Sequence, residues 1–104
     1  MSDETDVRAA LASMRASIDA LDHALVNLLA ERRSLVAEMF AYKRQHGLAL
    51  VDPDREAALL AERTAFAEAR GVPSILATRV FHDILEASHD DANATNLAQG
   101  ARRG

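Results

Sequence analysis

Apolar side chains recur along the first part of the chain at alternating intervals of three and four residues. This spacing places them on one face of an α-helix, so it predicts a long amphipathic helix from about Val7 to Gln45. The segment contains no proline or glycine, and Gly47 follows it as a residue that permits a left-handed exit. The predicted apolar face consists of Leu11, Met14, Ile18, Leu21, Leu25, Leu28, Leu35 and Met39.

Two shorter helices are predicted after a loop over residues 48–51. Asp52 is typical of an N-cap and Pro53 of a first helical position, so they indicate the start of the second helix. That helix is expected to end at Gly71, and Pro73 marks the start of the third. We find no pattern typical of β-strands and no internal repeat. The sequence therefore predicts an all-α fold with three helices per protomer.

Length and composition limit the classes of protein to consider. The 104 residues predict one domain over residues 7–92, with a disordered N-terminus over residues 1–6 and a frayed or disordered tail over residues 93–104. Cysteine is absent and no signal-peptide pattern is found, which favours a cytoplasmic protein. A net charge of −4, without a broad basic stripe or a long apolar run, argues against nucleic acid and membrane partners.

The first predicted helix is too long for a compact domain of this size. About 39 residues in a helix span ~58 Å, whereas a domain of this length has a radius of gyration of ~13 Å. Because the apolar face continues along the whole helix, something must cover it. We expect an intertwined homodimer in which two long helices pack side by side. The alternative is a kinked helix in a monomeric bundle, for which the sequence offers no breaker residue.

Arg32 interrupts the apolar face, at the position that the pattern reserves between Leu28 and Leu35. A guanidinium on a buried face needs an anionic partner, because an unpaired buried charge is costly. Lys43 lies eleven residues later, nearly three full helical turns, and so projects from almost the same side. Two cations on one line suggest a small anionic ligand. An ion-pair network within the protein remains the alternative.

Arg15 lies on the same predicted helix, seventeen residues before Arg32 and so ~25 Å away. One small ligand cannot contact both side chains within one chain. In an antiparallel dimer, however, Arg15 of one protomer could complete a site around Arg32 and Lys43 of the other. The alternative is an ordinary solvated arginine on a helix surface.

The start of the second predicted helix is rich in charge. Asp52 is explained by capping, but Arg55 in the first turn opposes the helix dipole. Arg55 could pair with Asp52, or it could bind a ligand carboxylate while Asp52 and Glu56 accept from a ligand hydroxyl. Ser88 brings a hydroxyl to the apolar face of the third helix, where a serine commonly bonds to the carbonyl four residues earlier.

The histidines give little indication of chemistry. His82 and His89 are seven residues apart and close to Asp90, a pattern that permits a metal pair only loosely. We expect both side chains to be solvated or to pack at a helix edge, and we expect no metal site.

The charged and apolar residues form an ordered set of motifs between about Leu11 and Asp91. In order along the chain they are Met14-Arg15, Ile18-Asp19, Leu21-Asp22, Leu28-Leu29-Ala30-Glu31-Arg32-Arg33, Tyr42-Lys43 and Asp52-Pro53-Asp54-Arg55-Glu56. This order and spacing resemble the all-helical chorismate mutases. The resemblance implies an intertwined dimer with two shared sites, which agrees with the argument from helix length. It also implies rearrangement of chorismate, a small dianion, to prephenate without a cofactor.

The resemblance further implies roles for individual residues. Arg32 and Arg55 would bind the substrate carboxylates, helped by Arg15 of the other protomer. Arginine suits this role because its planar fork matches a carboxylate. Lys43 would donate to the ether oxygen of the breaking bond.

The remaining implied roles concern the second and third helices. Asp52 and Glu56 would hold the ring hydroxyl, and Ser88 would line the site near a carboxylate. The family usually has a glutamine one turn after this serine, where the present chain has Ala92. Losing one preorganised donor typically costs about 10²–10³ in rate. Related reactions on 4-amino-4-deoxychorismate or isochorismate therefore stay open as alternatives. A non-catalytic dimeric ligand-binding or regulatory module is a further alternative, although a pure binder of the carboxylates would not require Lys43.

Overall fold

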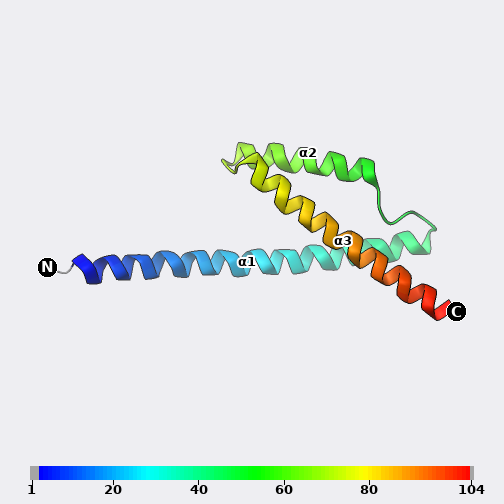
Figure 1. Cartoon of the computed structure of the whole chain (residues 1–104), viewed down its shortest axis with the longest axis horizontal. Coiled ribbons are helices and arrows are strands. Elements are labelled where there is room, and N and C mark those ends of the chain that lie inside the picture. The colour runs from blue at the N-terminus through cyan, green and yellow to red at the C-terminus, as the bar shows by residue number, and fades with distance from the viewer. Residues whose placement is uncertain (1–2, 104) are drawn as a thin grey trace. The chain divides into compact units, whose positions relative to one another are not determined.

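Three α-helices make up the fold, and the computed structural model describes the backbone of residues 3–103 and the side chains of residues 3–94. They are α1 (Asp3–Gln45), α2 (Pro53–Ala69) and α3 (Ser74–Arg103), shown in Figure 1. The predicted all-α class and the very long first helix are confirmed. None of the described helices combines the length and apolar character that crossing a membrane requires.

Two helix ends differ from the prediction. α1 begins at Asp3 rather than near Val7, and its first turn carries Asp3, Glu4 and Asp6, whose negative charges favour a helix N-terminus. α3 is helical through Arg103, beyond residue 92, where the tail was predicted to begin. Its last part is rich in alanine, the residue with the highest helix propensity, and this favours continuation. The predicted division into a domain and two terminal segments stays a prediction.

The second residue of each loop is a glycine in the left-handed conformation. At the end of α1, Gly47 has φ 67°, the Leu48 N–H donates to the Lys43 carbonyl at 2.8 Å, and the Gly47 N–H donates to the Arg44 carbonyl at 3.3 Å. This is a Schellman motif, and it confirms the predicted left-handed exit. Gly71, with φ 80°, ends α2 through the same pair of hydrogen bonds.

The chain divides into two compact units within α1, between Leu35 and Val36. In the first unit, large apolar side chains of α1 are 40–70% exposed. An exposed apolar surface of this extent is unusual for a monomeric protein. The exposed side chains are Val7, Leu11, Met14, Ile18, Leu21, Leu25, Val26, Leu28, Leu29 and Leu35.

The second unit contains the end of α1 together with α2 and α3, and in it α2 and α3 pack against each other as a hairpin (Figure 1). The hydroxyls of Thr64 and Thr78 lie 3.3 Å apart near the turn, and Glu56 contacts His89 farther from it. Residues earlier in α2 therefore face residues later in α3, as an antiparallel pair requires. The buried apolar side chains among those described are Phe40, Leu59, Ala77, Leu85 and Ala92.

Candidate functional site

The first unit carries the two predicted arginines of α1. Arg15 is exposed, and its guanidinium forms no hydrogen bond or ion pair within residues 3–94, so it is available to a group from outside the chain. Arg32 is half-buried, although Leu28 and Leu35 on either side of it are 61% and 65% exposed. Arg32 also has an interaction partner in the structure. Its anion-binding role stays a prediction.

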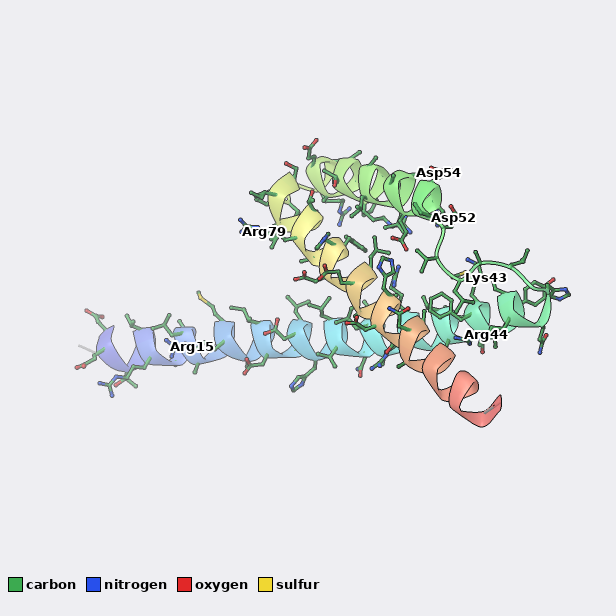
Figure 2. The ribbon with its side chains drawn as sticks, turned by 45° about the vertical axis from the view of Figure 1, so that its right-hand side comes forward. Arg15, Lys43, Arg44, Asp52, Asp54 and Arg79 are labelled. Carbon is green, nitrogen blue, oxygen red and sulfur yellow. The ribbon has the colours of Figure 1, made fainter. Side chains whose placement is uncertain are left out.

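Lys43 is anchored to the loop that joins α1 to α2. Its Nζ donates to the main-chain carbonyl of Leu50 at 3.1 Å, and both residues are half-buried. Figure 2 shows Lys43 beside this loop, with Asp52 where the loop enters α2. A lysine ammonium has three N–H groups, so the contact with Leu50 fixes its position and leaves two donors for a ligand.

Arg44 is a neighbouring cation that sequence reasoning did not single out (Figure 2). Its Nε and Nη2 atoms are buried and have no hydrogen-bond partner in the described part of the chain. A shielded donor without an acceptor costs about 1–3 kcal/mol. Arg44 therefore adds a second positive charge directly after Lys43 in the sequence, and two of its donor atoms are shielded from solvent without an acceptor.

The first turn of α2 forms as the sequence predicts. Asp52 is the N-cap, with extended backbone at φ −124° and ψ 95°, and its Oδ1 accepts from the Arg55 N–H at 3.1 Å. Pro53 occupies the first turn of α2, where a backbone N–H has no acceptor within the helix, so proline's lack of an N–H costs nothing there. The Arg55 side chain is exposed and forms no ion pair with Asp52 or with another described residue. Capping thus uses one Asp52 oxygen, and the Arg55 guanidinium remains available.

Glu56 and His89 connect α2 to α3. The His89 Nε2 lies 2.9 Å from Oε1 and 2.7 Å from Oε2 of Glu56, and both side chains are half-buried. Of the two expectations for His89, solvated or packed at a helix edge, the structure fits the second, with Glu56 as its partner. His89 binds both carboxylate oxygens of a predicted ligand-binding residue.

Two positions on α3 were singled out in the sequence, Ser88 and Ala92. Ser88 forms a hydrogen bond within its own helix, and Ala92 is buried. The Ser88 Oγ donates to the Ile84 carbonyl at 3.1 Å, the back-bond that a serine in a helix commonly forms. Its hydroxyl hydrogen is thus committed, and its oxygen can still accept. Ala92 is only 2% exposed, so its methyl group is enclosed where the family usually has a glutamine.

The sequence suggested that His82 could group with His89 and Asp90, but in the structure its neighbours are different. It lies near Asp83 and Glu86 of its own helix, at 3.6 and 3.7 Å, rather than near His89. All three side chains are exposed, and their potential ligand atoms lie within 4.8 Å of one another. Exposed clusters of this kind are typical of solvated helix surfaces, and this one lacks the enclosure of a structural metal site.

Two partners of the predicted site residues were missed in the sequence, the Leu50 carbonyl and the His89 ring. A main-chain carbonyl carries no residue-type signal. His89 lies 33 residues from Glu56 and on another helix, so no local spacing connects them. Only the register of the hairpin, which pairs residues before Thr64 with residues after Thr78, could have indicated the contact.

Comparison with known sequences agrees with the resemblance seen in the motifs. Residues 14–91 match the profile of the family described as chorismate mutase type II. The chain is 42% identical over 85 residues to the T-protein of Enterobacter agglomerans, covering 82% of this chain and 23% of that protein. It is 37% identical over 84 residues to the T-protein of Haemophilus influenzae, covering 81% and 22% of the two chains. The present chain thus spans under a quarter of each T-protein.

A third relative is of similar size. The chain is 29% identical over 76 residues to the chorismate mutase of Methanocaldococcus jannaschii, covering 73% of this chain and 77% of that protein.

Proposed function

Because the chain belongs to the type II chorismate mutase family, we propose that it catalyses the rearrangement of chorismate to prephenate. The observation that carries the proposal is the extent of the family match. Residues 14–91 include every residue that the motifs assign to the site. These are Arg15, Arg32, Lys43, Asp52, Arg55, Glu56 and Ser88.

The chemistry of the reaction fits these residue types. In the rearrangement a carbon–oxygen ether bond breaks while a carbon–carbon bond forms within the same molecule, and no proton, electron or cofactor is exchanged. The protein has to select the compact conformer of a dianion and to place positive charge where the ether oxygen gains electron density. Arginine forks and a lysine point charge meet these two requirements.

We assign the ether oxygen to Lys43 and the carboxylates to the arginines. The anchoring of the Lys43 Nζ by Leu50 supports this assignment, because a donor that is already fixed needs no reorganisation as charge develops. The free guanidiniums of Arg55 and Arg15 support the clamp. For Arg32 the assignment rests on the family match, which includes this position.

We assign the ring hydroxyl of the substrate to Asp52 and Glu56. The cap uses Oδ1 of Asp52, which leaves Oδ2 able to accept from a hydroxyl. Ser88 can accept a hydrogen bond but has already donated its own hydrogen to Ile84. We therefore place Ser88 at the margin of the site, where it turns toward a carboxylate only if it breaks its back-bond.

The proposal includes a homodimer with sites shared between its protomers. The exposed apolar face of α1 supports it, since covering ten large apolar side chains needs a partner of matching length and periodicity. A second copy of α1 meets that need. The site of each protomer would then be completed by Arg15 of the other protomer. A cytoplasmic location also belongs to this proposal, and the absence of cysteine fits it.

Ala92 favours a second candidate function, which is a related rearrangement or elimination on a close analogue of chorismate. Since Ala92 is enclosed and apolar, it supplies no donor to the ether oxygen. A mutase for 4-amino-4-deoxychorismate or a lyase for isochorismate would present different groups at this point. Asp52 and Glu56 suit a ring amine as well as a ring hydroxyl, so they do not separate the candidates.

A substrate comparison tests the proposal. Purified protein is mixed with chorismate, and the loss of chorismate absorbance is followed before the product is identified by chromatography. Isochorismate and 4-amino-4-deoxychorismate are measured in parallel, with Lys43→Ala as the inactive control. We expect prephenate from chorismate at the highest kcat/KM. A higher kcat/KM on one of the other two compounds would reassign the substrate, and no turnover of any would reject an enzymatic role.

A further inference from the structure

The contact between Glu56 and His89 has a defined donor. An ionised carboxylate only accepts hydrogen bonds, and both of its oxygens lie within 2.9 Å of the same ring nitrogen. The hydrogen must therefore sit on Nε2, which donates to the two oxygens together. This arrangement fixes the position of the Glu56 carboxylate and also the rotation of its plane. A free glutamate side chain would instead sample several rotamers.

The same contact leaves Glu56 able to bind a ligand. Each carboxylate oxygen has two lone-pair directions, and the single N–H of His89 occupies only the edge between the oxygens. The Glu56 side chain is 23% exposed, so part of it can still be reached. A hydroxyl approaching from that side would meet an acceptor whose orientation is already set.

His89 differs in this respect from His82, which precedes it by seven residues on α3. The His82 side chain is 60% exposed, and its nearest carboxylates belong to exposed residues of its own helix. His89 is 37% exposed and reaches across to α2. The chain thus contains a histidine of each kind on one helix, and they form a natural comparison.

We propose that His89 is a positioning residue of the site, which holds the Glu56 carboxylate in the orientation that accepts the ring hydroxyl of the substrate. This inference rests on the proposed function. The hydroxyl is present in the substrate as well as in the transition state, so its contact contributes to both. Losing the orientation should therefore weaken substrate binding more than it slows the bound substrate.

Three substitutions at His89 separate positioning from packing. His89→Ala removes the donor, and we expect KM for chorismate to rise about ten- to hundredfold with little change in kcat. His89→Gln places an amide N–H at nearly the reach of Nε2, so KM should return close to the wild-type value. His89→Asn is one carbon shorter and should behave like His89→Ala. His82→Ala is the matched control and should leave KM unchanged.

A second experiment tests whether His89 acts through Glu56. In a Glu56→Ala background, His89→Ala should raise KM no further, because its only proposed action has been removed. Thermal unfolding of every variant, followed by circular dichroism, identifies variants whose loss is merely structural. Those would lower Tm while the folded fraction keeps the wild-type KM.

The outcomes separate this inference from the function on which it rests. If wild-type protein turns over chorismate but His89→Ala and His82→Ala have the same KM, the positioning role is wrong and the proposed function stands. A further rise of KM in the Glu56→Ala background would also overturn it. If wild-type protein does not act on chorismate, the proposed function fails first and the positioning role fails with it.

Discussion

Leu21 offers the sharpest test of whether a second copy covers α1. It lies in the middle of the apolar face and, at 70%, is the most exposed of the large apolar side chains within residues 3–94. In a monomer its truncation would change little, because little of its surface is buried. In an intertwined dimer the same truncation removes an apolar contact twice, once from each protomer.

The exposed fraction sets the size of the expected effect. Burying a whole leucine side chain stabilises by about 1.5–3 kcal/mol. Since 70% of the Leu21 surface remains to be covered, dimerisation gains roughly 1–2 kcal/mol per chain, and so about 2–4 kcal/mol per dimer. Leu21→Ala removes most of that gain. Loss of the whole gain would raise the dimer dissociation constant by about 30- to 700-fold, and this range is the upper limit for Leu21→Ala.

Sedimentation velocity over a dilution series measures this constant. His23→Ala is the control, since residue 23 is turned ~200° from residue 21 around the helix and lies off the apolar face. We expect wild-type protein and His23→Ala to remain dimeric at micromolar concentration, while Leu21→Ala dissociates on dilution. A folded wild-type monomer at that concentration, or equal constants for Leu21→Ala and His23→Ala, would refute the argument from the exposed face.

Three further predictions concern the site. Arg32→Ala should lower kcat/KM to a background value mainly by raising KM, whereas Arg33→Ala should leave kcat/KM nearly unchanged; equal small effects in steady-state kinetics would mean that the wrong arginine was assigned. Mixing inactive Arg15→Ala chains with inactive Arg32→Ala chains should restore part of the activity, because one of the two hybrid sites is intact; verified subunit exchange without recovery would exclude shared sites. Ala92→Gln should lower stability by about 1–3 kcal/mol in thermal unfolding, since residue 92 is 2% exposed, while Ala94→Gln on the exposed side should not. Equal losses in these two variants would show that the enclosure of Ala92 is not the cause.

The sequence predicted well those features of the fold that depend on neighbouring residues. Asp52 caps α2, and Gly47 ends α1 in the left-handed conformation, because each depends on a few adjacent backbone groups. The helix ends at the termini were missed. At the termini, how far a helix extends depends on the summed helix propensities and charges of several residues, such as the acidic first turn that begins at Asp3. No single residue there marks the helix end.

The candidate site was predictable only in part, for a related reason. Its residue types and their order along the chain could be read from the sequence, and the family match covers them. Pairings between helices could not. His89 was set aside because its neighbours in sequence suggested nothing, yet its partner Glu56 comes from the other arm of the hairpin. Contacts that depend on the register of two packed helices need the structure.

The anchoring of Lys43 has a consequence for how this chain can vary through evolution. Its acceptor is the main-chain carbonyl of Leu50, which every amino acid possesses, so replacing the side chain at position 50 leaves the acceptor in place. The constraint falls instead on the number of residues between Gln45 and Pro53, where α1 ends and α2 begins. Inserting or deleting one residue there would move the carbonyl away from Nζ. Among descendants of this chain, the length of this loop should therefore be kept more strictly than its composition.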